Sequence, residues 1–173
     1  MNGQLMRKCI VTFTLIAVIV ASCSAQKSAD ENGESPKARA LKNRASPPKP
    51  ADVDKEATLD ALLQRKSETD WKNSKAAILE GRVVQVEKEE DGDVHIVLAA
   101  DKDEHDTSKW IIAEVTPAWR KRKPSMAEAI LRRLIQKKVR VTGWLFYEPE
   151  EEQGDPRGTR WELHPVTSIT VVE

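Results

Sequence analysis

Five polar residues in the C-terminal half have the types and the spacing to build a chemical site. Glu162 and His164 are two residues apart in a stretch with strand character, so both side chains point to one face, opposite Trp161 and Leu163. His95 alternates with apolar neighbours in an earlier stretch, and Glu114 lies in the stretch after that one. The full set is His95, Glu114, Arg160, Glu162 and His164.

Two kinds of site are open to this set. Its two imidazoles and two carboxylates are ligands for zinc and other transition metals, which would suit a metal-binding protein or a metal-dependent hydrolase. Their spacing matches no established metal signature. The alternative, which we favour, is a hydrogen-bonded polar network that includes Arg160 and fixes the register of the strands.

A second constellation is cationic. Between Trp119 and Arg140 the only acidic residue is Glu128, which predicts a local positive patch beside aromatic side chains. Such a patch could bind single-stranded nucleic acid or an anionic glycan, while the simpler interpretation is a solvated helix face. The candidate residues are Trp119, Arg120, Lys121, Arg122, Lys123, Arg132, Arg133, Lys137, Lys138 and Arg140.

Five segments between residue 71 and the C-terminus have the pattern of strands. Residues 77–87 are rich in Val and Ile, and Asp91-Gly92 predicts a two-residue hairpin turn before the alternating segment 94–99. The remaining strands are expected at 110–115, 138–146 and 161–172, the last broken near Pro165.

One helix is expected between the third and fourth strands. Ser125 and Glu128 have the spacing of a capping box, and an apolar stripe of Ile130, Leu131, Leu134 and Ile135 follows. A helix between strands three and four of five is the order of the oligonucleotide/oligosaccharide-binding (OB) barrel. The predicted fold is therefore mainly β, a five-stranded OB-like barrel, with a mixed α+β sheet of other topology as the alternative.

Parts of this region also resemble a known group of domains. The residues are Asp91 to His95, Glu114, Val141 to Trp144, and the run Trp161-Glu162-Leu163-His164-Pro165-Val166-Thr167. They are similar to an uncharacterised group of small OB-like domains in exported bacterial proteins. The resemblance covers residues 81–173 and implies a fold more than a function. This chain departs from it after the fourth strand, where an acidic EPEEEQ stands in place of the histidine of many relatives.

The N-terminus predicts a signal for export. Arg7 and Lys8 precede an apolar run from Ile10 to Ala21, which is too short for a membrane span of roughly 20 residues. The junction Val20-Ala21-Ser22-Cys23 resembles the bacterial lipobox. That resemblance implies cleavage after residue 22, lipidation of Cys23, and, with Ser24 following, an outer-membrane location facing the periplasm.

The rest of the N-terminal part divides into two segments. Residues 23–52 are rich in Ser, Ala, Lys and Pro without apolar periodicity, which predicts a disordered, lipid-anchored tether. Residues 53–70 predict a short amphipathic helix, with Asp52 or Asp54 as N-cap and three leucines on one face. We expect this helix to pack on the barrel domain, residues 71–173, rather than to bind a partner.

Together these features favour a lipid-anchored binding or accessory module of the cell envelope. Cys9 falls in the predicted signal, Cys23 carries the lipid, and no serine stands in a glycine elbow, so the chain offers no nucleophile. We expect no enzymatic activity and no cofactor, with a divalent metal such as zinc as the alternative. The expected partners are the membrane, through Cys23, and an envelope protein or anionic glycan, ahead of nucleic acid.

Overall fold

The computed structural model describes residues 35–103, 105–148 and 157–172. The predicted signal and the lipobox at Cys23 lie outside these residues. Within the described ranges, none of the helices has the length and apolar character needed to cross a membrane.

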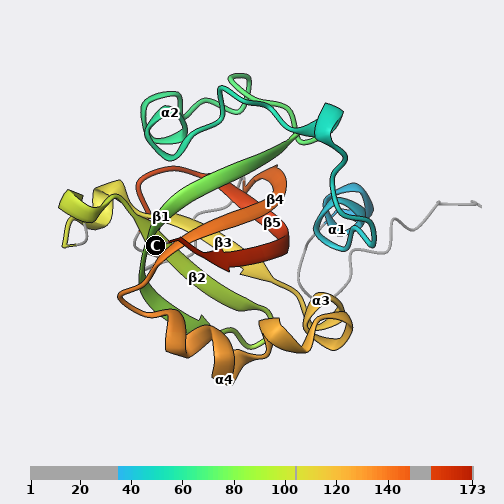
Figure 1. Ribbon diagram of the computed structural model, residues 1–173. Coiled ribbons are helices and arrows are strands. Elements are labelled where there is room, and N and C mark those ends of the chain that lie inside the picture. Colours follow the sequence, from blue (N-terminus) through green and yellow to red (C-terminus); the bar gives the residue numbers. More distant parts are fainter. Residues whose placement is uncertain (1–34, 104, 149–156, 173) are drawn as a thin grey trace, which may run out of the picture.

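Five strands close into a barrel, which confirms the predicted OB-like fold (Figure 1). The neighbours around the barrel are β1, β2, β3, β5 and β4, and β1 pairs with both β2 and β4. Only the contact between β3 and β5 is parallel, as Ala113 pairs with Leu163. The strands are β1 (Ala76–Lys88), β2 (Val94–Ala99), β3 (Ile111–Val115), β4 (Lys138–Tyr147) and β5 (Trp161–Val171).

Alternation along the strands fills the barrel. In β2 the inward residues are Val94, Ile96 and Leu98, which join one buried cluster with alternate residues of the other strands. In β3 the inward positions are Ile111, Ala113 and Val115. Residues between these positions point to the outer face of the barrel, and this places His95 and Glu114 there.

The connection from β3 to β4 is a series of short helical turns rather than one helix. It comprises α3 (Pro117–Arg122), η4 (Pro124–Met126), α4 (Glu128–Leu131) and η5 (Arg132–Leu134). The predicted capping box is wrong, because the N-cap of α4 is Ala127 and makes no side-chain bond. Ser125 is instead inside η4, a turn closed by the amide of Ala127 donating to Pro124. Leu131 is buried, whereas Ile130 and Ile135 are exposed.

The hairpin between β1 and β2 has a longer turn than predicted. The Glu89 amide donates to the Asp93 carbonyl and the Gly92 amide to the Glu89 carbonyl, so three residues lie between Glu89 and Asp93. Gly92 has a φ of 93°, which favours glycine in this position. The hairpin therefore has a three-residue turn in place of the predicted two-residue turn. This turn brings Glu89 and Asp93 side by side.

Strand β5 runs without a break past Pro165, contrary to the predicted interruption. The irregularity lies in its pairing with β4, where the register shifts on both sides of Gly143. A side chain at Gly143 would place its Cβ 2.9 Å from Leu163 Cβ and 3.1 Å from the Pro165 carbonyl oxygen. The absence of a side chain there lets the two strands approach at this shift.

Part of the segment expected to be a disordered tether is ordered. Residues 36–42 form α1 (Pro36–Lys42), capped by Ser35, and 50–52 form η1 (Pro50–Asp52). Residues 42–46, here called the strap, are bound by donors of the barrel domain: Trp119 Nε1 lies 2.9 Å from the Arg44 carbonyl and Trp144 Nε1 3.0 Å from that of Ser46. The composition correctly predicts that this segment buries little apolar surface. The strap is nevertheless ordered, because indole and guanidinium groups donate hydrogen bonds to its backbone carbonyls.

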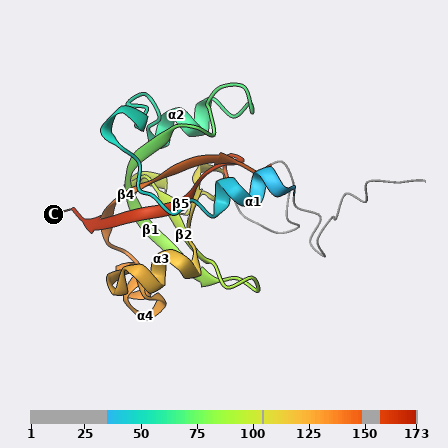
Figure 2. The ribbon, with the colours of Figure 1, turned by 90° about the vertical axis from the view of Figure 1, so that its right-hand side faces the viewer.

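Helix α2 (Leu59–Gln64) packs on the barrel as expected. Leu59, Leu62 and Leu63 are buried in the cluster that fills the barrel. Its N-cap is Thr58, whose hydroxyl accepts from the Ala61 amide, rather than Asp52 or Asp54. Figure 2 shows α2 on one side of the barrel, α3 and α4 on the other, and α1 beside β5. Two further turns, η2 (Asp101–Asp103) and η3 (Thr107–Lys109), lie between β2 and β3.

Candidate functional site

The outer face of β2, β3 and β5 gathers the polar residues predicted from the sequence. His95 and Glu114 are direct partners across β2 and β3, and His95 Nε2 lies 3.1 Å from Glu114 Oε1. Glu162 and His164 project from the same face of β5 and are both fully buried. Four of the five predicted residues therefore meet in one cluster.

His164 is at the centre of this cluster. Its Nδ1 lies 2.9 Å from Glu114 Oε2 and 3.2 Å from Glu162 Oε1. Its Nε2 lies 3.2 Å from Asp93 Oδ2, although this approach is not aligned as a hydrogen bond. One imidazole thus faces three buried carboxylates.

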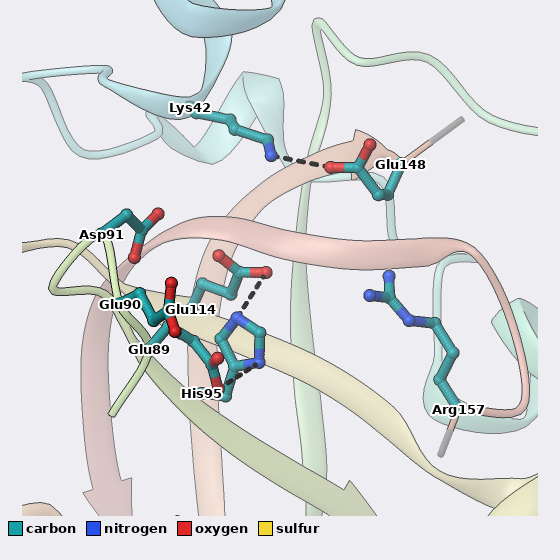
Figure 3. A pocket seen from close by; sticks show the side chains of 8 residues that line it. All are labelled: Lys42, Glu89, Glu90, Asp91, His95, Glu114, Glu148 and Arg157. Carbon is teal, nitrogen blue, oxygen red and sulfur yellow. Dashed lines mark ion pairs between the residues drawn. The ribbon is translucent and has the colours of Figure 1, made fainter. Parts of the chain in front are cut away.

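The contacts form an alternating chain of acids and imidazoles. His95 Nδ1 lies 3.3 Å from Glu89 Oε1, and Glu114 bridges His95 to His164. The chain begins at the half-exposed Glu89 and ends at the buried Asp93, and both ends belong to the hairpin turn between β1 and β2. Figure 3 shows the outer half of this chain, with His95 between Glu89 and Glu114.

The cluster contains an arginine that was not predicted from the sequence. Arg157 Nη1 lies 3.2 Å from Glu162 Oε2, and both side chains are largely buried. Arg160 lies just before β5, where its carbonyl accepts from the Glu148 amide. Arg157 therefore supplies a positive charge that balances Glu162.

Both histidines favour the protonated form. Burial lowers the pKa of His95, but the hydrogen bond and charge of Glu114, with the charge of Glu89, outweigh burial and raise the pKa to about 9. Burial also opposes protonation of His164, yet Glu114, Asp93 and Glu162 raise its pKa well above the ordinary value. In the metal-free protein each ring is an imidazolium held between carboxylates.

The carboxylates of the cluster differ in their charge. Burial raises the pKa of Glu114, but the charge and hydrogen bond of His164, with those of His95, hold it well below the ordinary value. Burial and the charge of Glu114 raise the pKa of Glu162 to about 7. Glu114 is therefore an anion at neutral pH, and Glu162 titrates near neutral pH.

A pocket of about 400 Å³ opens beside the cluster, and every side chain that lines it is ionisable. Carboxylates predominate in it, and Glu89, His95, Glu114 and Arg157 belong both to its wall and to the cluster. The lining residues are Lys42, Glu89, Glu90, Asp91, His95, Glu114, Glu148 and Arg157.

Lys42 brings the strap to this pocket. Its ammonium lies 2.7 Å from Glu148 Oε2 and 5.1 Å from the centre of the Phe146 ring. Burial lowers the pKa of Lys42, but the hydrogen bond to Glu148 and the charge of Glu162 raise it above its ordinary value. Lys42 thus brings an ammonium group to the wall of an acidic pocket (Figure 3).

Much of the predicted basic patch is engaged within the protein. Trp119 is buried, and Lys138 and Arg140 pair with Asp101 and Glu80. Lys121, Arg133 and Lys137 are exposed. Four other members donate to backbone carbonyls: Arg120 to Gly92, Arg122 to Ala45, Lys123 to Thr167 and Arg132 to Val86.

Several residues of the cluster and the pocket were not predicted from the sequence, among them Asp93, Glu89, Lys42 and Arg157. Asp93 stands two residues before His95, so strand parity alone could have placed it on the same face. Glu89 could have been found from a three-residue turn. No local pattern marks Lys42 or Arg157, because both reach the site through tertiary contacts.

The fold and the site define an OB-like barrel protein with a buried histidine–carboxylate cluster beside an acidic pocket. No protein-family model matches the chain, and no curated protein matches it. Among solved structures, it is similar to asparaginyl-tRNA synthetase of Entamoeba histolytica (13% identity, 60% of this chain, 22% of that chain, TM-score 0.41). It is also similar to aspartyl-tRNA synthetase of the same organism (17% identity, 66% of this chain, 20% of that chain, TM-score 0.42). The chain thus spans about a fifth of the length of these enzymes.

Proposed function

We propose that the protein is a lipid-anchored binding module of the cell envelope that takes a small, positively charged ligand into the acidic pocket. The observation that carries this proposal is the pocket itself: five carboxylates line it, against Lys42, Arg157 and His95. Concave sites with convergent charged groups are the usual places where proteins hold small ligands. The lipobox resemblance at Cys23 supplies the anchoring part of the proposal.

The position of Lys42 supports a positive charge on the ligand. A primary ammonium already lies at the wall of the pocket, between a carboxylate and the face of an aromatic ring. Ammonium ions are stabilised by both kinds of neighbour. An external cation would find the same partners, together with the acids of the hairpin turn, Glu90 and Asp91.

The nucleic-acid alternative has less support from the geometry. Its cationic residues mostly donate to carbonyls and carboxylates of the protein, and the pocket is acidic. An acidic pocket repels a phosphate backbone. We therefore do not carry binding of nucleic acid or anionic glycan further.

The ligand part is tested by titrating the purified full-length protein with Mn²⁺, Zn²⁺ and putrescine at low ionic strength, followed by calorimetry. We expect at least one of these cations to bind with one-to-one stoichiometry, and a Glu90→Gln, Asp91→Asn variant to bind it more weakly. The matched control is Glu80→Gln on the exterior of β1, which should bind as the unmodified protein does. Absence of binding by all three cations contradicts the proposal.

The anchoring part has its own test. The unmodified chain should fractionate with membranes and release into detergent, whereas Cys23→Ser should leave the membrane fraction, because a thioether needs the sulfur. Cys9→Ser serves as the control and should fractionate like the unmodified chain. A Cys23→Ser protein that stays in the membrane fraction overturns this part alone.

A further inference from the structure

We infer that Asp93, Glu114 and His164 form a binding site for a divalent transition-metal ion, reached through the acidic pocket. The inference rests on the proposed function, since it names the cation that the pocket admits. The three residues can each offer one ligand atom such that all three atoms lie within 4.8 Å of one another, and all three are buried.

The spacing of the donor atoms suits one ion. Two ligand atoms that each lie about 2.0–2.2 Å from the same ion are about 3.0–3.5 Å apart at tetrahedral or octahedral angles. His164 Nε2 and Asp93 Oδ2 are separated by 3.2 Å. A small movement of either side chain would place an ion between them.

A second observation points to a ligand at the same atom. His164 Nε2 is buried and makes no hydrogen bond among the described residues, although the ring is almost completely enclosed. Buried polar atoms nearly always have a partner. Its nearest polar neighbour, Asp93 Oδ2 at 3.2 Å, is not aligned as a hydrogen bond, and a metal ion on Nε2 would replace this contact by a direct bond.

The other side of the ring is already held as metal sites require. Nδ1 faces Glu162 at 3.2 Å, and Glu162 is in turn held by Arg157. Glu114 Oε2 lies 2.9 Å from the same nitrogen, and the Glu114 carboxylate would turn toward the ion when the ion binds. A carboxylate on the distal nitrogen orients a ligating imidazole and makes it a stronger donor. Glu162 is therefore a positioning residue, and Arg157 keeps it in place.

The donor set selects the kind of ion. One imidazole nitrogen with carboxylate oxygens suits zinc, manganese or ferrous iron, whereas calcium prefers oxygen ligands alone. Three protein ligands leave a position that water or an exchanging group can take. Glu114 also lines the pocket, so the pocket and the inferred metal site share this carboxylate.

The experiment uses the full-length protein stripped with a chelator and titrated with Zn²⁺, Co²⁺ and Ca²⁺. We expect one equivalent of Zn²⁺ or Co²⁺ to bind, little binding of Ca²⁺, and a Co²⁺ visible absorption spectrum typical of mixed nitrogen and oxygen ligands. Long-range ¹H–¹⁵N spectra of the unmodified protein should show Zn²⁺ shifting Nε2 of His164 and leaving His105 unchanged, so this readout needs no variant.

Two variants separate the roles of the residues. Asp93→Asn should lose Co²⁺ affinity by more than Glu162→Gln, for which we expect a loss of about 10–100-fold. Glu80→Gln is the control and should keep the affinity, with folding of each variant checked by circular dichroism. Equal Co²⁺ affinity in Asp93→Asn and the unmodified protein overturns the inference.

The outcomes also separate this inference from the proposed function. If neither Zn²⁺ nor Co²⁺ binds stoichiometrically but putrescine does, the metal site is refuted and the cationic pocket stands. If putrescine, Mn²⁺, Zn²⁺ and Co²⁺ all fail to bind, both are refuted. If a metal binds but shifts only the nitrogen resonances of His95, the metal lies beside His95 instead, and the assignment to His164 is refuted.

Discussion

At the scale of single residues, His95 links the stability of the protein to pH. Its folded pKa of about 9 lies above the value of about 6.5 expected in the unfolded chain. A raised pKa contributes stability that is complete below pH 6.5 and is lost as the pH rises through 9. The raised pKa of His164 and of Glu162 acts in the same direction.

We therefore expect the metal-free protein to lose stability between pH 6.5 and 9, by up to about 3 kcal/mol from His95. Urea unfolding of the full-length protein at pH 6, 7.5 and 9, with chelator present, measures the change. His95→Gln should flatten the dependence, whereas the exposed residue His105→Gln should not. A free energy of unfolding that rises over this range would contradict the assignment.

The depressed pKa of Glu114 affects the stability of the protein at acidic pH. Its contribution is present above the ordinary glutamate pKa and is lost as the pH falls through the folded value. The two effects together place the maximum of stability in the mildly acidic to neutral range. The cluster is therefore an ionic unit whose members depend on one another's charge.

At the scale of elements, Gly143 is the position where β4 and β5 can least tolerate a side chain. Gly143→Ala would bring a methyl group within 2.9 Å of Leu163 Cβ, next to His164. We expect a loss of about 1–3 kcal/mol in the free energy of unfolding. Ile78→Ala on the neighbouring strand β1 is the control, because Ile78 is exposed and should cost far less. Thermal denaturation of both variants checks this, and equal melting temperatures would count against it.

The sequence predicts the strands well because alternation is a local signal. The alternation of side chains along a strand places Glu162 and His164 on one face of β5. It also places His95 on the face opposite Val94 and Ile96, and the structure confirms both placements. The turn, the capping box and the break at Pro165 were wrong, since each depends on how a neighbour completes its hydrogen bonds. Lys42 and Arg157 were beyond prediction, because only tertiary contacts bring them to the cluster.

At the scale of the whole molecule, the strap is joined to the barrel by few and specific bonds. Trp144 donates to the Ser46 carbonyl, and the Arg44 guanidinium lies 4.4 Å from the centre of the Trp144 ring. Trp144→Phe keeps a ring but removes the donor. We expect trypsin to cleave faster at Arg39, Lys42 and Arg44, with little change in melting temperature.

Mass spectrometry of the fragments measures this release. The control is Trp71→Phe, which removes a similar bond, from Trp71 Nε1 to the Arg65 carbonyl, away from the strap. Cleavage at the three sites in Trp144→Phe at the rate of the unmodified protein would show that the indole donor does not hold the strap.

The strap and the pocket are coupled through Lys42. Lys42→Ala removes a positive charge from the wall of the pocket, so an external cation should bind roughly tenfold more tightly, equivalent to about 1.4 kcal/mol. Calorimetry with putrescine measures the affinity, and Lys37→Ala on the exposed side of α1 is the control. Unchanged or weaker binding in Lys42→Ala would show that the ammonium does not compete with the ligand.

The docking of Lys42 also limits where the pocket can be in the cell. With Cys23 as the proposed anchor, 19 residues separate the lipid from Lys42. Even fully extended, they span at most about 65 Å. A lipid-anchored pocket would thus stay within about 65 Å of the membrane surface, whereas the counterion layer of an anionic surface is only about 8 Å thick at physiological ionic strength. If Cys23 is the anchor, the pocket would therefore meet cations of the surrounding solution as well as those held at the membrane surface.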